Sequence, residues 1–239
     1  MAKGAGSTRS NSTRTNSTGN YLIGGNYDPY ITDDLNDYYL PMSVRREITS
    51  IENIRTYNDL KKSLSSYGIS LETDEEKFNK NPDTEYKLLS VSGQKLIIGI
   101  ETYRTMFGNN ALSKLKKIVI SDKEETATAA YYFNKKGEKD PKAGSLRFKN
   151  YDIDGVTVFH ELAHAMQDSF AKKGEDAISY SARVVSSAKL HKNFKAYFGA
   201  NSEAMKAEKF ADAFGKGIAQ GDKLGLDFIN RMFKMYGKH

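Results

Sequence analysis

The run VTVFHELAHAMQDSF, residues 156–170, constrains the fold more than any other part of the chain. Apolar residues recur along it at intervals of three and four, which predicts an amphipathic helix with one face in the core. His160 and His164 are four residues apart, so a helix places both imidazoles on one side. Glu161 lies about a third of a turn from His160. The helix must therefore be buried in a way that leaves these three polar side chains together.

Two histidines with this spacing suit a metal ion, and the composition limits the ligands that can complete its coordination. The chain contains no Cys, so further ligands have to be His, Asp or Glu. A catalytic zinc site has three protein ligands and a water molecule, whose proton a nearby glutamate accepts. The pattern H-E-x-x-H predicts such a site, with His160 and His164 as zinc ligands and Glu161 as general base.

The third ligand does not follow the motif directly. The extended pattern H-E-x-x-H-x-x-G-x-x-H is absent, because Gln167 and Phe170 stand at the positions of its Gly and third His. His191, in the basic run KLHKNF, is one candidate. The carboxylates of NSEAMKAEKFADAFGKG are the others, and among them Glu203 is the alternative to our preferred residue, Glu208.

This acidic segment predicts a second amphipathic helix with two carboxylates beside its apolar face. The expected apolar positions are Ala204, Ala207, Phe210, Ala211 and Phe214. Glu208 and Asp212 are four residues apart and share one side of the helix. We therefore predict that Glu208 is the third ligand and that Asp212 accepts a hydrogen bond from a ligating histidine.

HELAH, followed 44 residues after His164 by EKFADAF, resembles the gluzincin-type metallopeptidase domain of anthrax lethal factor and its phage-encoded relatives. In that family a helix of the form E-F-F-A-E-A-F supplies the third zinc ligand from its first Glu, which corresponds to Glu208. The resemblance covers about residues 118–239. It implies a zinc-dependent endopeptidase that acts on a protein or peptide substrate.

The resemblance also implies an oxyanion donor and a substrate strand. Family members place a Tyr just before the third-ligand helix, where its hydroxyl donates to the oxyanion. The nearest tyrosine is Tyr197, eleven residues before Glu208, and Tyr180 is the alternative. An exposed edge strand in such peptidases pairs with the extended substrate, and we assign this strand to GSLRFKN, residues 144–150.

Composition divides the chain into three parts. Residues 1–20 are mainly Gly, Ser, Thr and Asn with basic residues and no acids, which predicts a flexible basic tail. Residues 21–110 combine a Tyr-rich irregular stretch, two helical segments and a polar connection, GISLETDEEKFNKNPDTE, and should pack on the catalytic domain. Residues 111–239 should form a zincin-like metallopeptidase domain.

Periodicity within these parts predicts an α+β fold. Three β-rich runs, KKIVISD, ATAAYYFN and GSLRFKN, indicate a small and mostly antiparallel sheet. The H-E-x-x-H helix follows them, and ISYSARVVSSAKL, SEAMKAEKFADAFGKGIAQG and LDFINRMFKMYG then indicate a C-terminal helical subdomain.

Charge and hydropathy bear on partners and location. The net charge of +6 permits contact with nucleic acid, and the basic N-terminal tail is the expected contact. We expect neither a signal peptide nor a transmembrane segment, and a cytoplasmic or virion-associated protein of phage or mobile-element origin. The alternative function is a virion structural or DNA-contacting protein that retains a zincin fold with little or no peptidase activity.

Overall fold

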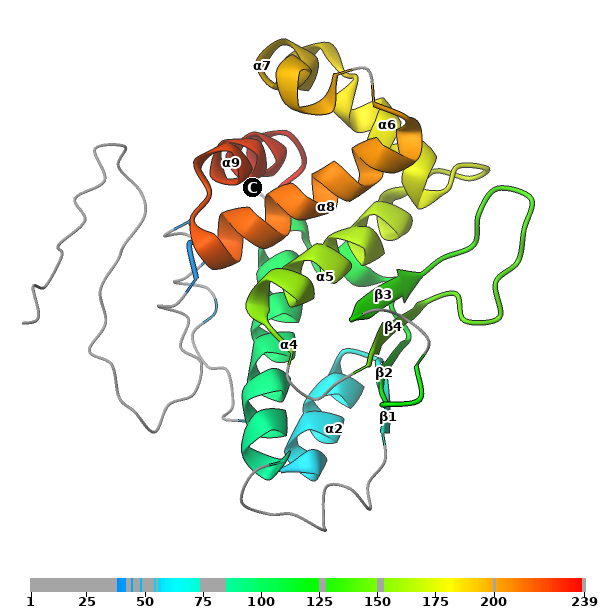
Figure 1. Ribbon diagram of the computed structural model, residues 1–239, viewed down its shortest axis with the longest axis vertical. Coiled ribbons are helices and arrows are strands. Elements are labelled where there is room, and N and C mark those ends of the chain that lie inside the picture. The colour runs from blue at the N-terminus through cyan, green and yellow to red at the C-terminus, as the bar shows by residue number, and fades with distance from the viewer. Residues whose placement is uncertain are drawn as a thin grey trace, which may run out of the picture.

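Helix α5 (Gly155–Phe170), which carries both histidines, lies between two groups of elements in the computed structural model (Figure 1). One group contains α2 (Tyr57–Ser66), α4 (Glu85–Phe107), the 3-10 helix η2 (Asn109–Leu112) and a β-sheet. The other contains α6, α7, α8 and α9. The structure describes residues 38–41, 44, 48, 54, 56–73, 85–124, 128–149, 153–199 and 201–237. The predicted tail, residues 1–20, lies outside them.

The sheet contains four short strands in the order β1-β2-β4-β3: β1 (Ser70–Thr73), β2 (Lys117–Ile120), β3 (Ala129–Tyr132) and β4 (Ser145–Phe148). β1 and β4 both pair with β2 in parallel, and only β3 is antiparallel to its neighbour β4. The prediction of a mostly antiparallel sheet is therefore wrong. The chain passes through α4 between β1 and β2, and a crossover of this length returns the next strand in the parallel direction.

Two further predictions about the strands are wrong. GSLRFKN forms β4, which lies inside the sheet, and β3 is the edge strand of the described sheet on that side. β1 lies in the segment that we expected to be a polar connection. β1 also joins residues 70–73 to the rest of the sheet, because it pairs along its whole length with β2.

The predicted helices that fall on described residues are present, with one break, whereas most of residues 43–55, the first part of an expected helical segment, lies outside them. Asp154 caps α5 by accepting a hydrogen bond from the Thr157 amide. ISYSARVVSSAKL is divided between α6 (Ala177–Val185) and α7 (Ala188–Phe198) at a pair of serines. The last two helices are α8 (Glu203–Gln220) and α9 (Lys223–Tyr236). The structure is therefore a mixed α/β fold with a helical C-terminal part.

Close helix contacts on both sides hold α5 in place. A Cβ atom added at Gly99 of α4 would lie 2.6 Å from Leu162 Cδ1, and one added at Gly215 of α8 would lie 2.7 Å from the Val156 carbonyl oxygen. Aromatic rings fill the space beside these contacts: Tyr103, Phe107, Phe159, Phe210, Phe214 and Phe228. No helix in the described part of the chain has the length and apolar character needed to cross a membrane.

Candidate metal centre

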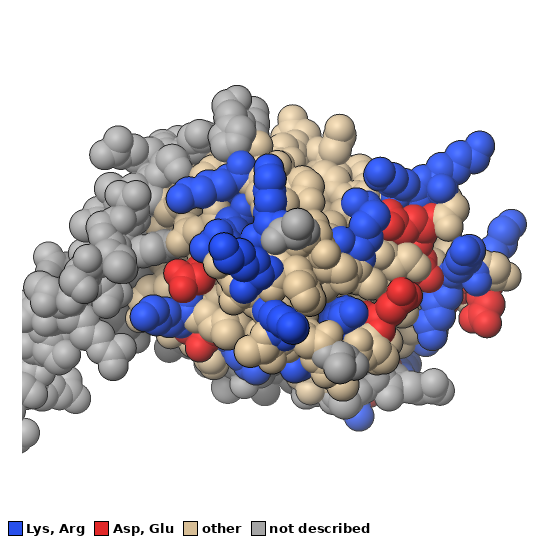
Figure 2. Space-filling view, turned by 90° about the horizontal axis from the view of Figure 1, so that it is seen from above, with Lys and Arg blue, Asp and Glu red and all other residues tan. Residues whose placement is uncertain are grey.

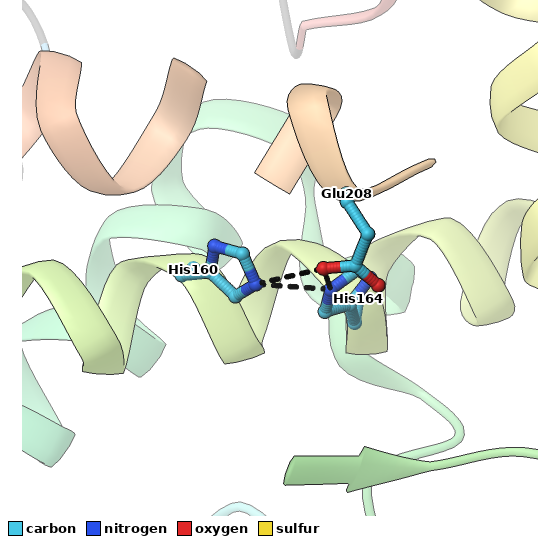
Figure 3. Close-up of side chains that lie close together, drawn as sticks. All are labelled: His160, His164 and Glu208. Carbon is cyan, nitrogen blue, oxygen red and sulfur yellow. Dashed lines mark hydrogen bonds and ion pairs between the residues drawn. The ribbon is translucent and has the colours of Figure 1, made fainter. Parts of the chain in front are cut away.

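Helices α5 and α8 bring together the three residues that we predicted as ligands (Figure 3). His160 Nε2 and His164 Nε2 are 3.1 Å apart, and Glu208 Oε2 lies 3.5 Å from each of them. The two histidine side chains are 19% and 9% exposed, whereas that of Glu208 is 58% exposed. The cluster therefore has a buried side on α5 and an accessible side on α8.

The spacing of these donor atoms suits a small metal ion. Zinc bonds to nitrogen and carboxylate oxygen are about 2.0–2.2 Å long, so neighbouring ligands of a tetrahedral ion are about 3.4 Å apart. The three distances of 3.1, 3.5 and 3.5 Å bracket this value. His160, His164 and Glu208 can therefore hold a metal ion and leave one coordination position for another ligand.

The other nitrogen of each ring has an acceptor that fixes the tautomer. His160 Nδ1 lies 3.1 Å from Asp212 Oδ1, and His164 Nδ1 lies 2.8 Å from Gln167 Oε1. Gln167 Nε2 donates to the Ala207 carbonyl oxygen at 3.0 Å, so its Oε1 must be the atom that faces the ring. Both histidines thus carry hydrogen on Nδ1, and a neutral ring held in this way directs its Nε2 lone pair at the centre of the cluster.

Electrostatics of the cluster favour a bound cation. Two lone pairs and a carboxylate oxygen at these distances repel each other unless a proton or a metal ion lies among them. Burial lowers the pKa of His164, but its hydrogen bond to Glu208 and the charges of Glu161 and Glu208 outweigh burial and raise this pKa overall. The bonds from His160 and His164 hold the pKa of the Glu208 carboxyl well below its usual range.

Glu161 is fixed beside the cluster on the side of the sheet. Its carboxylate is buried, and its Oε2 accepts a hydrogen bond of 2.7 Å from the main-chain N–H of Tyr131, on the edge strand β3. Its charge contributes to the raised pKa of His164. The predicted base and the predicted ligands therefore occupy one site, with Glu161 between α5 and β3 and Glu208 on the opposite side.

The remaining predicted candidates are not part of the cluster. The Tyr197 hydroxyl donates to the Lys209 carbonyl oxygen at 3.1 Å, so it would have to leave that bond to reach an oxyanion. Tyr180 is buried between Phe170 and Phe210 in the core. His191 and Glu203 are exposed on α7 and α8 and do not belong to the metal-binding group found among the described residues.

Gln167 and Tyr131 are site residues that sequence reasoning missed. Gln167 stands where a longer motif has Gly, and its position three residues after His164, which puts it on the same helix face, is the signal that could have identified it. Tyr131 contacts Glu161 through its main-chain N–H. Almost every residue has this group, so the residue type gives no sign of the contact. Comparison with protein-family models, curated proteins and solved structures finds no match to this chain.

Asp212→Ala and Gln167→Ala should each weaken zinc binding by about 10- to 100-fold, because each removes the acceptor that orients one ligand ring. Competition with a fluorescent zinc chelator measures the affinity. Asp227→Ala, the same change at an exposed position of α9, is the control and should leave the affinity unchanged. Equal affinities in all three variants would refute the orienting role of these acceptors.

Gly215→Ala should destabilise the protein by about 1–3 kcal/mol and also weaken metal binding, since the new methyl group would push α8 away from α5. Gly99→Ala is the matched control. Its methyl group would meet Leu162 and Val158 on the α4 side of α5, so it should cost stability without changing metal affinity. Thermal melts and zinc titrations of both variants separate the two effects, and equal affinity losses would contradict the prediction.

Proposed function

We propose that the protein is a zinc-dependent endopeptidase of the gluzincin type. The observation that carries this proposal is the convergence of His160, His164 and Glu208, with Glu161 held next to them. A zinc ion bound by these three residues would polarise a water molecule and the substrate carbonyl. The resemblance of HELAH and EKFADAF to the lethal factor family supports the same conclusion, and its phage-encoded members support a virion-associated or cytoplasmic location.

In this proposal Glu161 is the proton carrier. Its Oε2 is engaged by the Tyr131 N–H, so Oε1 is the oxygen left to accept the proton of the attacking water. The same carboxyl then gives that proton to the leaving amine. Asp212 and Gln167 keep the two imidazoles in the tautomer that directs Nε2 at the metal. Tyr197 remains a candidate for the oxyanion donor.

Strand β3 is the proposed place for the substrate. The carbonyl groups of Thr128 and Tyr132 accept hydrogen bonds from Lys149 and Gly144, so the main-chain groups of Ala129 and Tyr131 face away from β4. The Tyr131 N–H already meets Glu161 there. An extended peptide that pairs with this edge would lie next to the general base, which is why we propose a peptide substrate.

Metal analysis followed by a cleavage assay tests the proposal. The purified protein should hold about one zinc ion per chain. It should cut peptides in a proteome-derived library, as detected by mass spectrometry of new termini. A chelator should abolish cleavage and added zinc should restore it. Absence of stoichiometric metal, or cleavage that the chelator leaves intact, would count against the proposal.

A second candidate function, nucleic-acid contact in a virion, has one structural observation in its favour. Residues 177–202 contain no acid, and Lys189, Lys192 and Lys195 are exposed on α7. Figure 2 shows blue side chains gathered over the end of the molecule that carries this helix. Lysines arranged in this way would neutralise backbone phosphates without reading sequence.

Binding of duplex DNA at about 50 mM salt tests this candidate. The triple substitution of Lys189, Lys192 and Lys195 by Glu should weaken binding and reduce its dependence on salt, whereas Glu161→Gln should have no effect. A chain lacking residues 1–20 measures the contribution of the predicted tail. The candidate fails if the wild-type protein does not bind DNA or if the triple variant binds equally well.

A further inference from the structure

Tyr131 makes two separate contacts with α5, and only one of them involves Glu161. Its main-chain N–H donates to Glu161 Oε2 at 2.7 Å, and its phenol donates to Asp168 Oδ2 at 3.0 Å. Burial raises the pKa of this phenol, and the charge and hydrogen bond of Asp168 raise it further, so the phenol keeps its proton and acts as the donor. One residue of the edge strand thus joins two carboxylates of the helix.

The two carboxylates lie on the same face of α5. Glu161 and Asp168 are seven residues apart, which is about two helical turns, and a separation of seven residues returns to nearly the same angle. Tyr131 therefore spans about two turns of the helix. A shift of β3 along α5, or away from it, would break at least one of its two bonds.

Asp168 is itself held by a third element. Its Oδ1 accepts a hydrogen bond from Lys114 Nζ at 2.9 Å, just after η2. The main-chain N–H of Lys114 also donates to Ser169 Oγ at 3.2 Å. The Asp168 side chain is only 9% exposed, although that of Lys114 is 47% exposed, so the carboxylate is held on the buried side of this pair. The carboxylate that receives the Tyr131 phenol therefore has a fixed position.

We propose that Tyr131, Asp168 and Lys114 form a brace that sets the position of Glu161 relative to the substrate strand. All three are positioning residues, since none of them belongs to the metal cluster. This inference rests on the proposed peptidase function for its effect on rate, but the brace itself is independent of that function. Through the brace, the strand that would bind the peptide also orients the base that would act on it.

The brace predicts a specific kinetic pattern. Tyr131→Phe removes the phenol bond but keeps the ring, its stacking on Phe133 and the main-chain amide. Without this bond, β3 should hold the Glu161 carboxylate less precisely. Even a small displacement of a catalytic group lowers the rate of the chemical step. We expect kcat to fall by about 10-fold, with KM and zinc affinity within about twofold of wild type.

Tyr132→Phe is the matched control, because it is the same chemical change at the next residue of β3, on the opposite face of the strand.

Asp168→Asn should have an intermediate effect, because it keeps an acceptor for the phenol but loses the charge that pairs with Lys114. Its kcat should fall less than that of Tyr131→Phe. A Tyr131→Phe enzyme with wild-type kcat, or an equal loss in Tyr132→Phe, would overturn the brace.

Hydrogen exchange tests the brace without any activity. The amide proton of residue 131, which bonds to Glu161, should exchange faster in Tyr131→Phe and Asp168→Asn than in wild type, and at the wild-type rate in Tyr132→Phe. Unchanged exchange in the first two variants would refute the brace even if the protein proves to be a peptidase. Faster exchange in a protein that cleaves nothing would support the brace and count against the proposed function.

Discussion

Glu161→Gln is expected to lower peptidase kcat by about 10²- to 10⁴-fold while about one zinc ion per chain remains bound. Glutamine keeps the size of the side chain and can still accept the Tyr131 N–H through its oxygen. It cannot accept the proton of the attacking water, so the chemical step should lose its base. Single-turnover cleavage of a fluorogenic peptide and metal analysis of the same sample measure the two quantities.

Glu203→Gln is the control for this substitution. Glu203 is exposed at the start of α8, outside the group of three residues that could hold a metal ion. The control should keep full activity and zinc content, which would also remove it as an alternative third ligand. Retained cleavage in Glu161→Gln would show that another group is the base, and loss of zinc would show that Glu161 acts on the metal site itself.

Removal of the metal should give the second large effect, a fall in thermal stability. A ligand present at about 1,000 times its Kd stabilises the folded state by about 4 kcal/mol. For a domain of this size, that corresponds to a fall in Tm of about 8–16 °C when a chelator removes it. The ligands come from α5 and α8, so the loss should be global and not confined to a loop. Differential scanning calorimetry with and without chelator measures it.

A matched variant makes this prediction specific. His164→Ala should abolish the chelator effect, because the cluster loses a ligand, while His191→Ala, on exposed α7, should retain it.

The affinity of the site for zinc should also increase with pH. The pKa of His164 is raised, so a proton competes with the metal up to a higher pH than at an ordinary histidine. Zinc titrations at about pH 6 and about pH 8 should therefore differ, with tighter binding at the higher pH. A Tm that is insensitive to chelator would contradict the metal site.

The C-terminal helices and the grouping of His160, His164 and Glu208 could be predicted because both depend on local spacing. His160 and His164 share a face on any helix, and the apolar period of α8 placed Glu208 and Asp212 beside its buried side. Ala204 was wrongly expected in that buried stripe, because the first turn of α8 extends beyond the core and leaves it exposed. The pairing of the two helices came only from the resemblance and from the chemistry that two histidines require.

The strand order could not be predicted, because it depends on contacts between distant segments. β1 is only four residues long, has no fully buried side chain, and carries a single large apolar residue, Leu71, so SLET is too short and too polar to mark a strand. β4 follows β3 in the chain but lies between β2 and β3 in the sheet. Nothing in GSLRFKN distinguishes such an inner strand from an edge strand. The brace was missed for the same reason, since Tyr131 and Asp168 are 37 residues apart and meet only in the folded chain.

The unequal exposure of His160, His164 and Glu208 would affect the rate at which a bound metal ion exchanges. His160 and His164 are held from behind by Asp212 and Gln167, whereas Glu208 sits at the surface with a side chain that is 58% exposed. Metal ions should therefore enter and leave the site past Glu208. During dissociation, the bonds to the two histidines should be the last to break. Glu208→Gln should then accelerate metal dissociation far more than it slows association. Such a site would acquire and release its ion through one exposed carboxylate, without unfolding of the helices that frame it.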